Sequence, residues 1–172
     1  MPSYQGELDG LCGAYAIANA LEQCGLGKHH ETFFQIACAA ASERGPQHIW
    51  EGTSFSILRR MLAACLRSPS NRAGIRASYP FYRETPPSNA AYWERFDKQF
   101  ENDRALCGIV GLIKPTPHWL VIAPDGRRLI FTNSDPSGLY QRKNRAAVFA
   151  GTRRKRPGQW LLDRRELVVL SA

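Results

Sequence analysis

Three apolar runs follow one another in CGIVGLIKPTPHWLVIAPDGRRLIFTN, residues 107–133. The first, CGIVGLI, is almost continuous, which is typical of a strand buried on both faces. The next two, HWLVIAP and RRLIFTN, flank Asp125-Gly126, and this dipeptide between apolar runs is a strong hairpin signal. Further strands are predicted over 139–149 and 159–170. The C-terminal part of the chain is therefore predicted to form an antiparallel sheet.

Helical patterns dominate the part of the chain that comes before this sheet. Apolar residues recur at helical spacing over 12–24, where Asp9 is the predicted N-cap, and again over 29–44. A third helix is predicted from Thr53 onward and a fourth after Asn89, with a short strand over 75–79 between them. The prediction is a single α+β domain over 1–172, with a helical half over 1–104 and a β-rich half over 105–172.

Composition and the N-terminal segment limit the classes of protein to consider. The chain has 172 residues, 44% of them hydrophobic, which suits one globular domain with a real core. No stretch approaches the ~20 apolar residues that a bilayer span needs. MPSYQGELDG has neither the basic nor the apolar part of a secretory signal, so we expect a cytoplasmic protein. An effector delivered by a secretion system that needs no such signal would look the same.

The net positive charge comes from the second half of the chain. Residues 1–104 hold eleven Lys/Arg and eleven Asp/Glu, and residues 105–172 hold twelve and four, so the whole excess of +8 is C-terminal. It concentrates in RKNR (142–145) and RRKR (153–156). Because aromatic residues are not interleaved with these clusters, nucleic acid is not the expected partner. We expect either an acidic region of a protein substrate or simply a solvated surface.

The five cysteines do not form a disulfide framework or a metal site. They lie at positions 12, 24, 38, 65 and 107, an odd number without a CxxC pair. Cys24, Cys38 and Cys65 occur within alanine-rich helical patterns and are interpreted as inert core residues. No metal and no organic cofactor are expected.

Cys12 differs from the other cysteines because it opens a helix and has a histidine partner in a suitable place. A helix N-terminus and a nearby imidazole both favour the thiolate that a cysteine nucleophile needs. His118 begins a predicted strand, and Asp135 follows the next strand, so a hairpin would return it to His118. We therefore predict Cys12 as nucleophile, His118 as base and Asp135 as the group that orients the base.

Two more residues complete the predicted site. The side-chain amide of Gln5 could donate to the oxyanion beside the backbone N–H of Cys12. Asn133 is an alternative to Asp135, since both come just after RRLIFT. Gly13 and Ala14 are small, which would let a substrate backbone approach the sulfur. His29, His30 and His48 lack a strand partner and are interpreted as surface or packing residues.

The segment QGELDGLCGAYAIANAL, together with HWLVI and a later Asp-Pro, resembles papain-like cysteine peptidases. It is most similar to the double-glycine leader peptidases that process bacteriocin precursors, and the order of residues is also similar to that of Josephin-type deubiquitinases. The resemblance covers two islands, 4–21 and 107–138. It implies a papain-like fold and the roles of Gln5, Cys12, His118 and Asp135 given above.

Three functions are compatible with these residues. The first is a cysteine hydrolase that cleaves peptide or isopeptide bonds of a polypeptide substrate. The second is a glutamine deamidase, transglutaminase-like or acyltransferase toxin, because the same three residues can act on a different carbonyl. The third is a basic binding module without enzymatic activity, in which Cys12 is a core residue.

Overall fold

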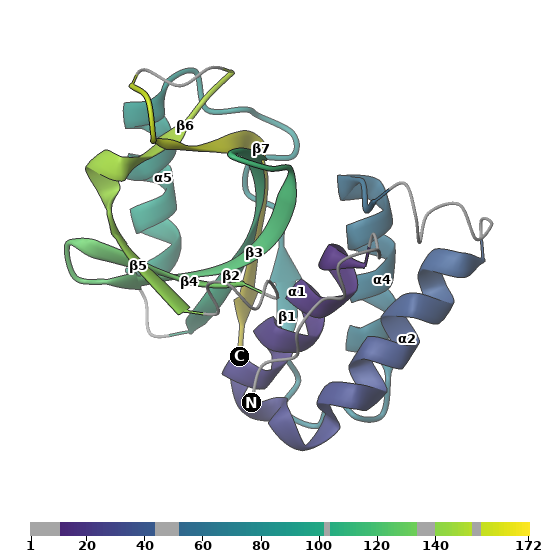
Figure 1. The fold of residues 1–172 in the computed structure, drawn as a ribbon. Coiled ribbons are helices and arrows are strands. Elements are labelled where there is room, and N and C mark those ends of the chain that lie inside the picture. The colour runs from purple at the N-terminus through teal and green to yellow at the C-terminus, as the bar shows by residue number, and fades with distance from the viewer. Residues whose placement is uncertain (1–10, 44–51, 102–103, 134–139, 153–155) are drawn as a thin grey trace.

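The computed structural model describes residues 11–43, 52–101, 104–133, 140–152 and 156–172 (Figure 1). Within these residues, seven strands form one sheet. Six of them follow the order β1-β7-β2-β3-β4-β5, and the seventh, β6, pairs with β7 outside this order. Helices come first along the chain and most of the sheet follows, so the predicted α+β class is confirmed.

The centre of the sheet matches the prediction closely. β2 (Ala105–Lys114) is buried over its six central residues, as the apolar run indicated. It pairs antiparallel with β3 (His118–Asp125), which pairs antiparallel with β4 (Arg128–Thr132). The loop of the predicted hairpin is Gly126-Arg127, and Gly126 takes the positive φ of 57° that such a tight turn favours.

The edges of the sheet differ from the prediction. The single strand expected over 139–149 is instead β5 (Tyr140–Asn144), the 3-10 turn η4 (Arg145–Ala147) and β6 (Val148–Ala150). The turn redirects the chain, so β6 runs parallel to the final strand β7 (Trp160–Ser171). The Arg145 guanidinium, on this turn, forms a two-pronged ion pair with the Asp97 carboxylate, a contact across segments that local sequence does not reveal. The sheet is therefore mixed rather than wholly antiparallel.

The helices lie close to their predicted positions, and their caps differ. α1 (Cys12–Leu21) ends earlier than expected and passes into the π-turn η1 (Glu22–Leu26), where Gly25 has φ 85°. Its N-cap position is Leu11, not the predicted Asp9, which lies outside the described residues. A 3-10 turn η2 (Gly27–His29) leads to α2 (His30–Ser42).

Serine side chains cap the remaining two helices. Ser54 accepts from Ile57 N at the start of α4 (Phe55–Arg67). Ser88, not the predicted Asn89, caps α5 (Asn89–Phe100) by accepting from Ala91 N. The Asn89 side-chain oxygen Oδ1 instead accepts from the Trp93 indole and from Ala150 N, and so links α5 to β6.

Two hydrophobic cores form on the two faces of the sheet. One contains α1, α2 and α4 together with Trp119 and Val121 of β3. The other contains α5 together with Leu120 and Ile122, as strand alternation requires. Figure 1 shows α5 enclosed by the curved sheet, apart from the other three helices. The short β1 (Arg76–Ser78) also pairs with β7, so the first half of the chain contributes to both cores and to the sheet.

No helix in the described part of the chain has both the length and the apolar character that spanning a bilayer requires.

Candidate functional site

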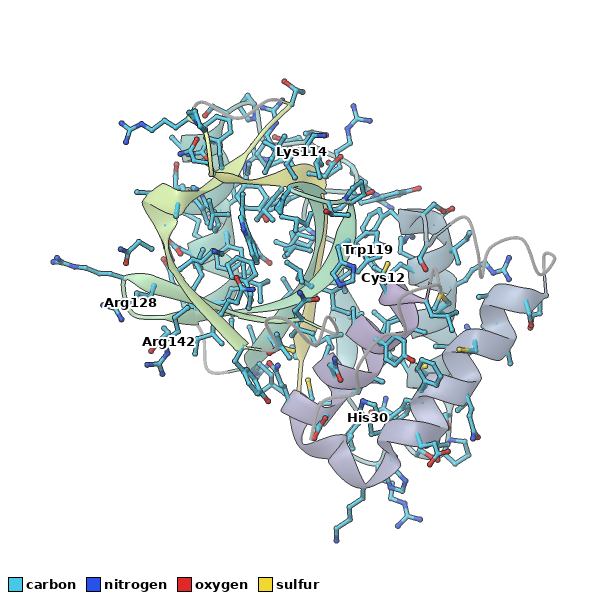
Figure 2. The ribbon with its side chains drawn as sticks, in the orientation of Figure 1. Cys12, His30, Lys114, Trp119, Arg128 and Arg142 are labelled. Carbon is cyan, nitrogen blue, oxygen red and sulfur yellow. The ribbon has the colours of Figure 1, made fainter. Side chains whose placement is uncertain are left out.

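Cys12 is the first residue of α1, as predicted, and it lies where the helices meet the sheet. α1 packs against β3, and in Figure 2 Cys12 is next to Trp119 of that strand. Cys12 is 8% exposed, and it lines a cavity. The N-terminus of a helix carries partial positive charge, which favours negative charge at this position.

Cys12 and residues of the sheet line one cavity of about 550 Å³. Its walls come from the start of α1, from residues 52–57, and from β2, β3 and β7. The residues on which the site depends are Cys12, Thr53, Gly111, His118, Trp119 and Glu166. The structure therefore brings the predicted nucleophile and the predicted base, 106 positions apart in sequence (118 − 12), to one cavity.

His118 enters this cavity from the very start of β3 and is partly exposed. Strand alternation groups it with Leu120, on the face opposite Trp119 and Val121. It lines the cavity from the first position of the strand, beside Pro117. The predicted position of His118 at a strand start is confirmed.

The wall next to Cys12 is built by Thr53. A Cβ on Gly13 would lie 2.6 Å from Thr53 Cγ2 and 2.7 Å from Thr53 Oγ1, so only glycine fits between them. The Trp119 indole donates a hydrogen bond of 2.6 Å to the Thr53 carbonyl oxygen and holds this segment against β3. The space expected to admit a substrate backbone beside Gly13 is therefore occupied by the Thr53 side chain.

Glu166 is a member of the cavity that sequence reasoning missed. It is partly buried on β7, and its carboxylate lies against Gly111, where a Cβ would be 1.9 Å from Glu166 Oε2. Burial, and then the nearby charge of Asp163, raise the pKa of Glu166 to about 7. In the sequence RRELVVL this glutamate looks like an ordinary exposed residue of a strand, and only the pairing of β2 with β7 turns it inward.

Of the candidates for the orienting residue, Asn133 is described by the structure and Asp135 is not. Asp135 and Gln5 are outside the described residues. Asn133, the alternative, is partly buried directly after β4. Val121 pairs with Thr132, so the end of β4 runs alongside the beginning of β3, where His118 lies.

The other four cysteines lie in different surroundings. Cys24, Cys65 and Cys107 are buried, Cys38 is partly buried, and all five cysteines of the chain are free. Burial raises the pKa of Cys65 to about 12. The Cys24 and Cys107 sulfurs are 3.8 Å apart, and their hydrogen bond lowers the pKa of Cys24 while that of Cys107 is raised. The inert-core interpretation of Cys24 and Cys65 agrees with this burial.

His30 and the RKNR cluster do not line the cavity. His30 contacts the buried Asn19 at 3.0 Å, and burial lowers its pKa, in keeping with a packing role. In RKNR, Arg142 pairs with Asp125, Lys143 covers the Trp160 ring and Arg145 pairs with Asp97. His48 and residues 153–155 of RRKR are outside the described residues.

Comparison of the chain with protein-family models, with curated proteins and with solved structures gave no match. Function is therefore inferred from the residues and their geometry.

Proposed function

We propose that this protein is a papain-like cysteine hydrolase that cleaves peptide or isopeptide bonds of a polypeptide substrate. One observation carries the proposal: Cys12 at the start of α1 and His118 at the start of β3 line the same cavity of about 550 Å³. A cysteine at a helix N-terminus that shares a cavity with an imidazole has what a thiolate nucleophile needs. The volume is in the range of ordinary ligand pockets.

The chemistry follows from these two groups. His118 takes the proton of the Cys12 thiol, and the thiolate attacks the substrate carbonyl carbon. The resulting oxyanion accepts hydrogen bonds from the Cys12 backbone N–H and, in this proposal, from Gln5. When the tetrahedral intermediate collapses, His118 gives the proton to the leaving amine and an acyl thioester remains on Cys12. Water activated by His118 then releases the acid product.

Asp135 is the proposed orienting residue, and the register of the hairpin supports it. Val121 pairs with Thr132. The end of β4 therefore runs alongside the part of β3 near His118, and Asp135 comes three residues after Thr132 in the sequence. A carboxylate would both aim the imidazole and stabilise the imidazolium that pairs with the thiolate.

The setting we propose is a reducing compartment such as the cytoplasm, because a thiol nucleophile accompanied by four other free cysteines suits one. An acidic region of the substrate would contact the basic C-terminal residues.

Mass spectrometry of a treated proteome tests the proposal. A cell lysate is incubated with the protein or with its Cys12→Ala variant, and peptides are compared between the two. New termini that need Cys12 are the expected result. A +1 Da shift on glutamine without new termini would establish deamidation instead. No change that depends on Cys12 would contradict any enzymatic role for this cavity.

A further inference from the structure

A bulge in β7 brings Glu166 into the cavity. Val110 pairs with Leu167, and Leu112 pairs with Leu162, so residues 163–166 all lie opposite the single residue Gly111. Bulges of this kind commonly re-aim a side chain next to a functional site. Because Gly111 has no Cβ, the Glu166 carboxylate can occupy the position directly against it.

Hydrogen bonds within the bulge and to residues 85–87 hold it in this shape. Asp163 Oδ1 accepts a hydrogen bond of 2.8 Å from Arg165 N. Arg164 donates to the carbonyl oxygens of Pro86 and Pro87, at 3.0 and 2.6 Å. The Arg165 guanidinium donates to Thr85 Oγ1 at 3.1 Å. The two arginines of the bulge therefore point to the 85–87 segment. Glu166 is the bulge residue that lines the cavity.

No lysine or arginine of the described residues pairs with the Glu166 carboxylate. Within the described part of the chain, neither an ion pair nor a hydrogen bond joins it to another residue. The titratable groups that share the cavity are Cys12 and His118, and the lining residues from 52–57 and from β2 carry no charge. A partly buried carboxylate without a partner is unfavourable until a cation reaches it.

We propose that Glu166 makes the cavity selective for substrates with a lysine or arginine side chain close to the carbonyl that Cys12 attacks. This inference rests on the proposed function, since it takes Cys12 as the attacking atom. The substrate cation would fill the cavity next to Gly111 and pair with Glu166, and its charge would complete an electrostatically unsatisfied site. A substrate with an acidic or neutral side chain at that position would leave the carboxylate desolvated and unpaired.

Thiol-directed probes of matched size test this selectivity without any substrate. The folded full-length protein is treated with 3,3-dimethylbutyl methanethiosulfonate, which is neutral, and with 2-(trimethylammonio)ethyl methanethiosulfonate, its cationic isostere. Modification of Cys12 is followed by peptide mapping. The ratio of the cationic to the neutral rate measures the preference for positive charge, because the thiolate fraction cancels. Cys38, a partly buried thiol outside the cavity, provides the internal reference ratio.

At pH 8 we expect Glu166→Gln to lower the ratio at Cys12 by roughly fivefold, the effect of one charge a few ångströms away in a partly hydrated site. Gly111→Ala should lower it as well, because its Cβ would displace the carboxylate without deleting it. Glu101→Gln, which removes an exposed carboxylate after α5, should leave the ratio unchanged.

The possible failures are distinguishable. If Cys12 reacts but its ratio equals that of Cys38 and is unaffected by Glu166→Gln, the selectivity proposal is overturned and the hydrolase proposal stands. If neither probe modifies Cys12 in the wild-type protein, the proposed function itself is overturned. The wild-type ratio alone decides the case if a variant does not fold.

Discussion

Glu166 and Cys12 show which properties of a single residue can be read from sequence. Cys12 and His118 were predicted because each begins an element, and the start of an element is visible in local patterns. Glu166 was not, because its role depends on a change of register between β2 and β7. Strand pairing is a long-range property, and a bulge leaves no local signal in an apolar strand.

The raised pKa of Glu166 predicts how stability changes with pH. Burial, together with the charge of Asp163, raises this pKa from 4.5 to about 7 in the folded protein. Folding therefore favours the protonated acid, and this contribution is present below about pH 4.5 and lost as pH rises through about 7. Thermal unfolding of wild type and Glu166→Gln should be compared from pH 4.5 to 8. We expect the wild type to lose stability relative to the variant across that range, whereas a constant difference would contradict the buried carboxylate.

At the level of elements, the approach of α1 to the segment before α4 depends on Gly13. Gly13→Ala would drive a Cβ into the Thr53 side chain, and overpacking of this kind typically costs about 1–3 kcal/mol. The free energy of unfolding, measured with denaturant, should fall by that amount. Thr53→Gly should relieve most of the loss in the double variant, because all three contacting atoms belong to that side chain. An equal loss in both backgrounds would mean that Gly13 is needed for another reason.

Two alanine variants, made in the segment that follows the strand β4, distinguish Asp135 from Asn133 as the orienting residue. Asp135→Ala should abolish most turnover and slow the alkylation of Cys12 near pH 6, because the imidazolium loses its carboxylate. Asn133→Ala should have little effect on either quantity. Melting temperatures of both variants provide the control for folding. The reverse pattern would reassign the triad to Cys12, His118 and Asn133 and would weaken the resemblance to leader peptidases.

Element boundaries were less predictable than element types. The hairpin around Gly126 and the buried strand β2 follow from strong local patterns, and both are confirmed. The division of 139–149 into β5, η4 and β6 depends on distant partners: Asp97 for Arg145, and Asn89 for Ala150. Because the Asn89 side chain accepts hydrogen bonds from Trp93 of α5 and Ala150 of β6, Ser88 caps α5 instead.

At the scale of the whole molecule, the RKNR cluster and the cavity are separate features. In Figure 2, Arg128 and Arg142 lie on the opposite side of the view from Cys12 and Trp119. The RKNR side chains contact Asp125, Trp160 and Asp97, so they contribute to the packing of the sheet. A requirement for a cation near Glu166 and an attraction for acidic regions at the C-terminal basic residues can therefore coexist.

Charge reversal tests the role of RRKR. Replacing residues 153–156 with glutamate should leave the melting temperature nearly unchanged, since exposed charges contribute little to stability. For an acidic protein substrate it should raise KM and flatten the salt dependence of kcat/KM. The matched control reverses four exposed basic residues of the first half: Lys28, Arg72, Arg76 and Arg83. Identical kinetics for both variants and the wild type would identify RRKR as a solvated surface.

Alkylation of the five cysteines near pH 6 is the most direct test of whether Cys12 and His118 act together. Limiting iodoacetamide followed by peptide mapping should label Cys12 well ahead of Cys24, Cys38, Cys65 and Cys107 in the wild-type protein. His118→Ala should slow the labelling of Cys12 by at least about tenfold, because the imidazolium that stabilises the thiolate is gone. His29→Ala, which removes a histidine outside the cavity, should leave it unchanged. Equal labelling of all five thiols, or a Cys12 rate that does not depend on His118, would contradict the proposed nucleophile and base.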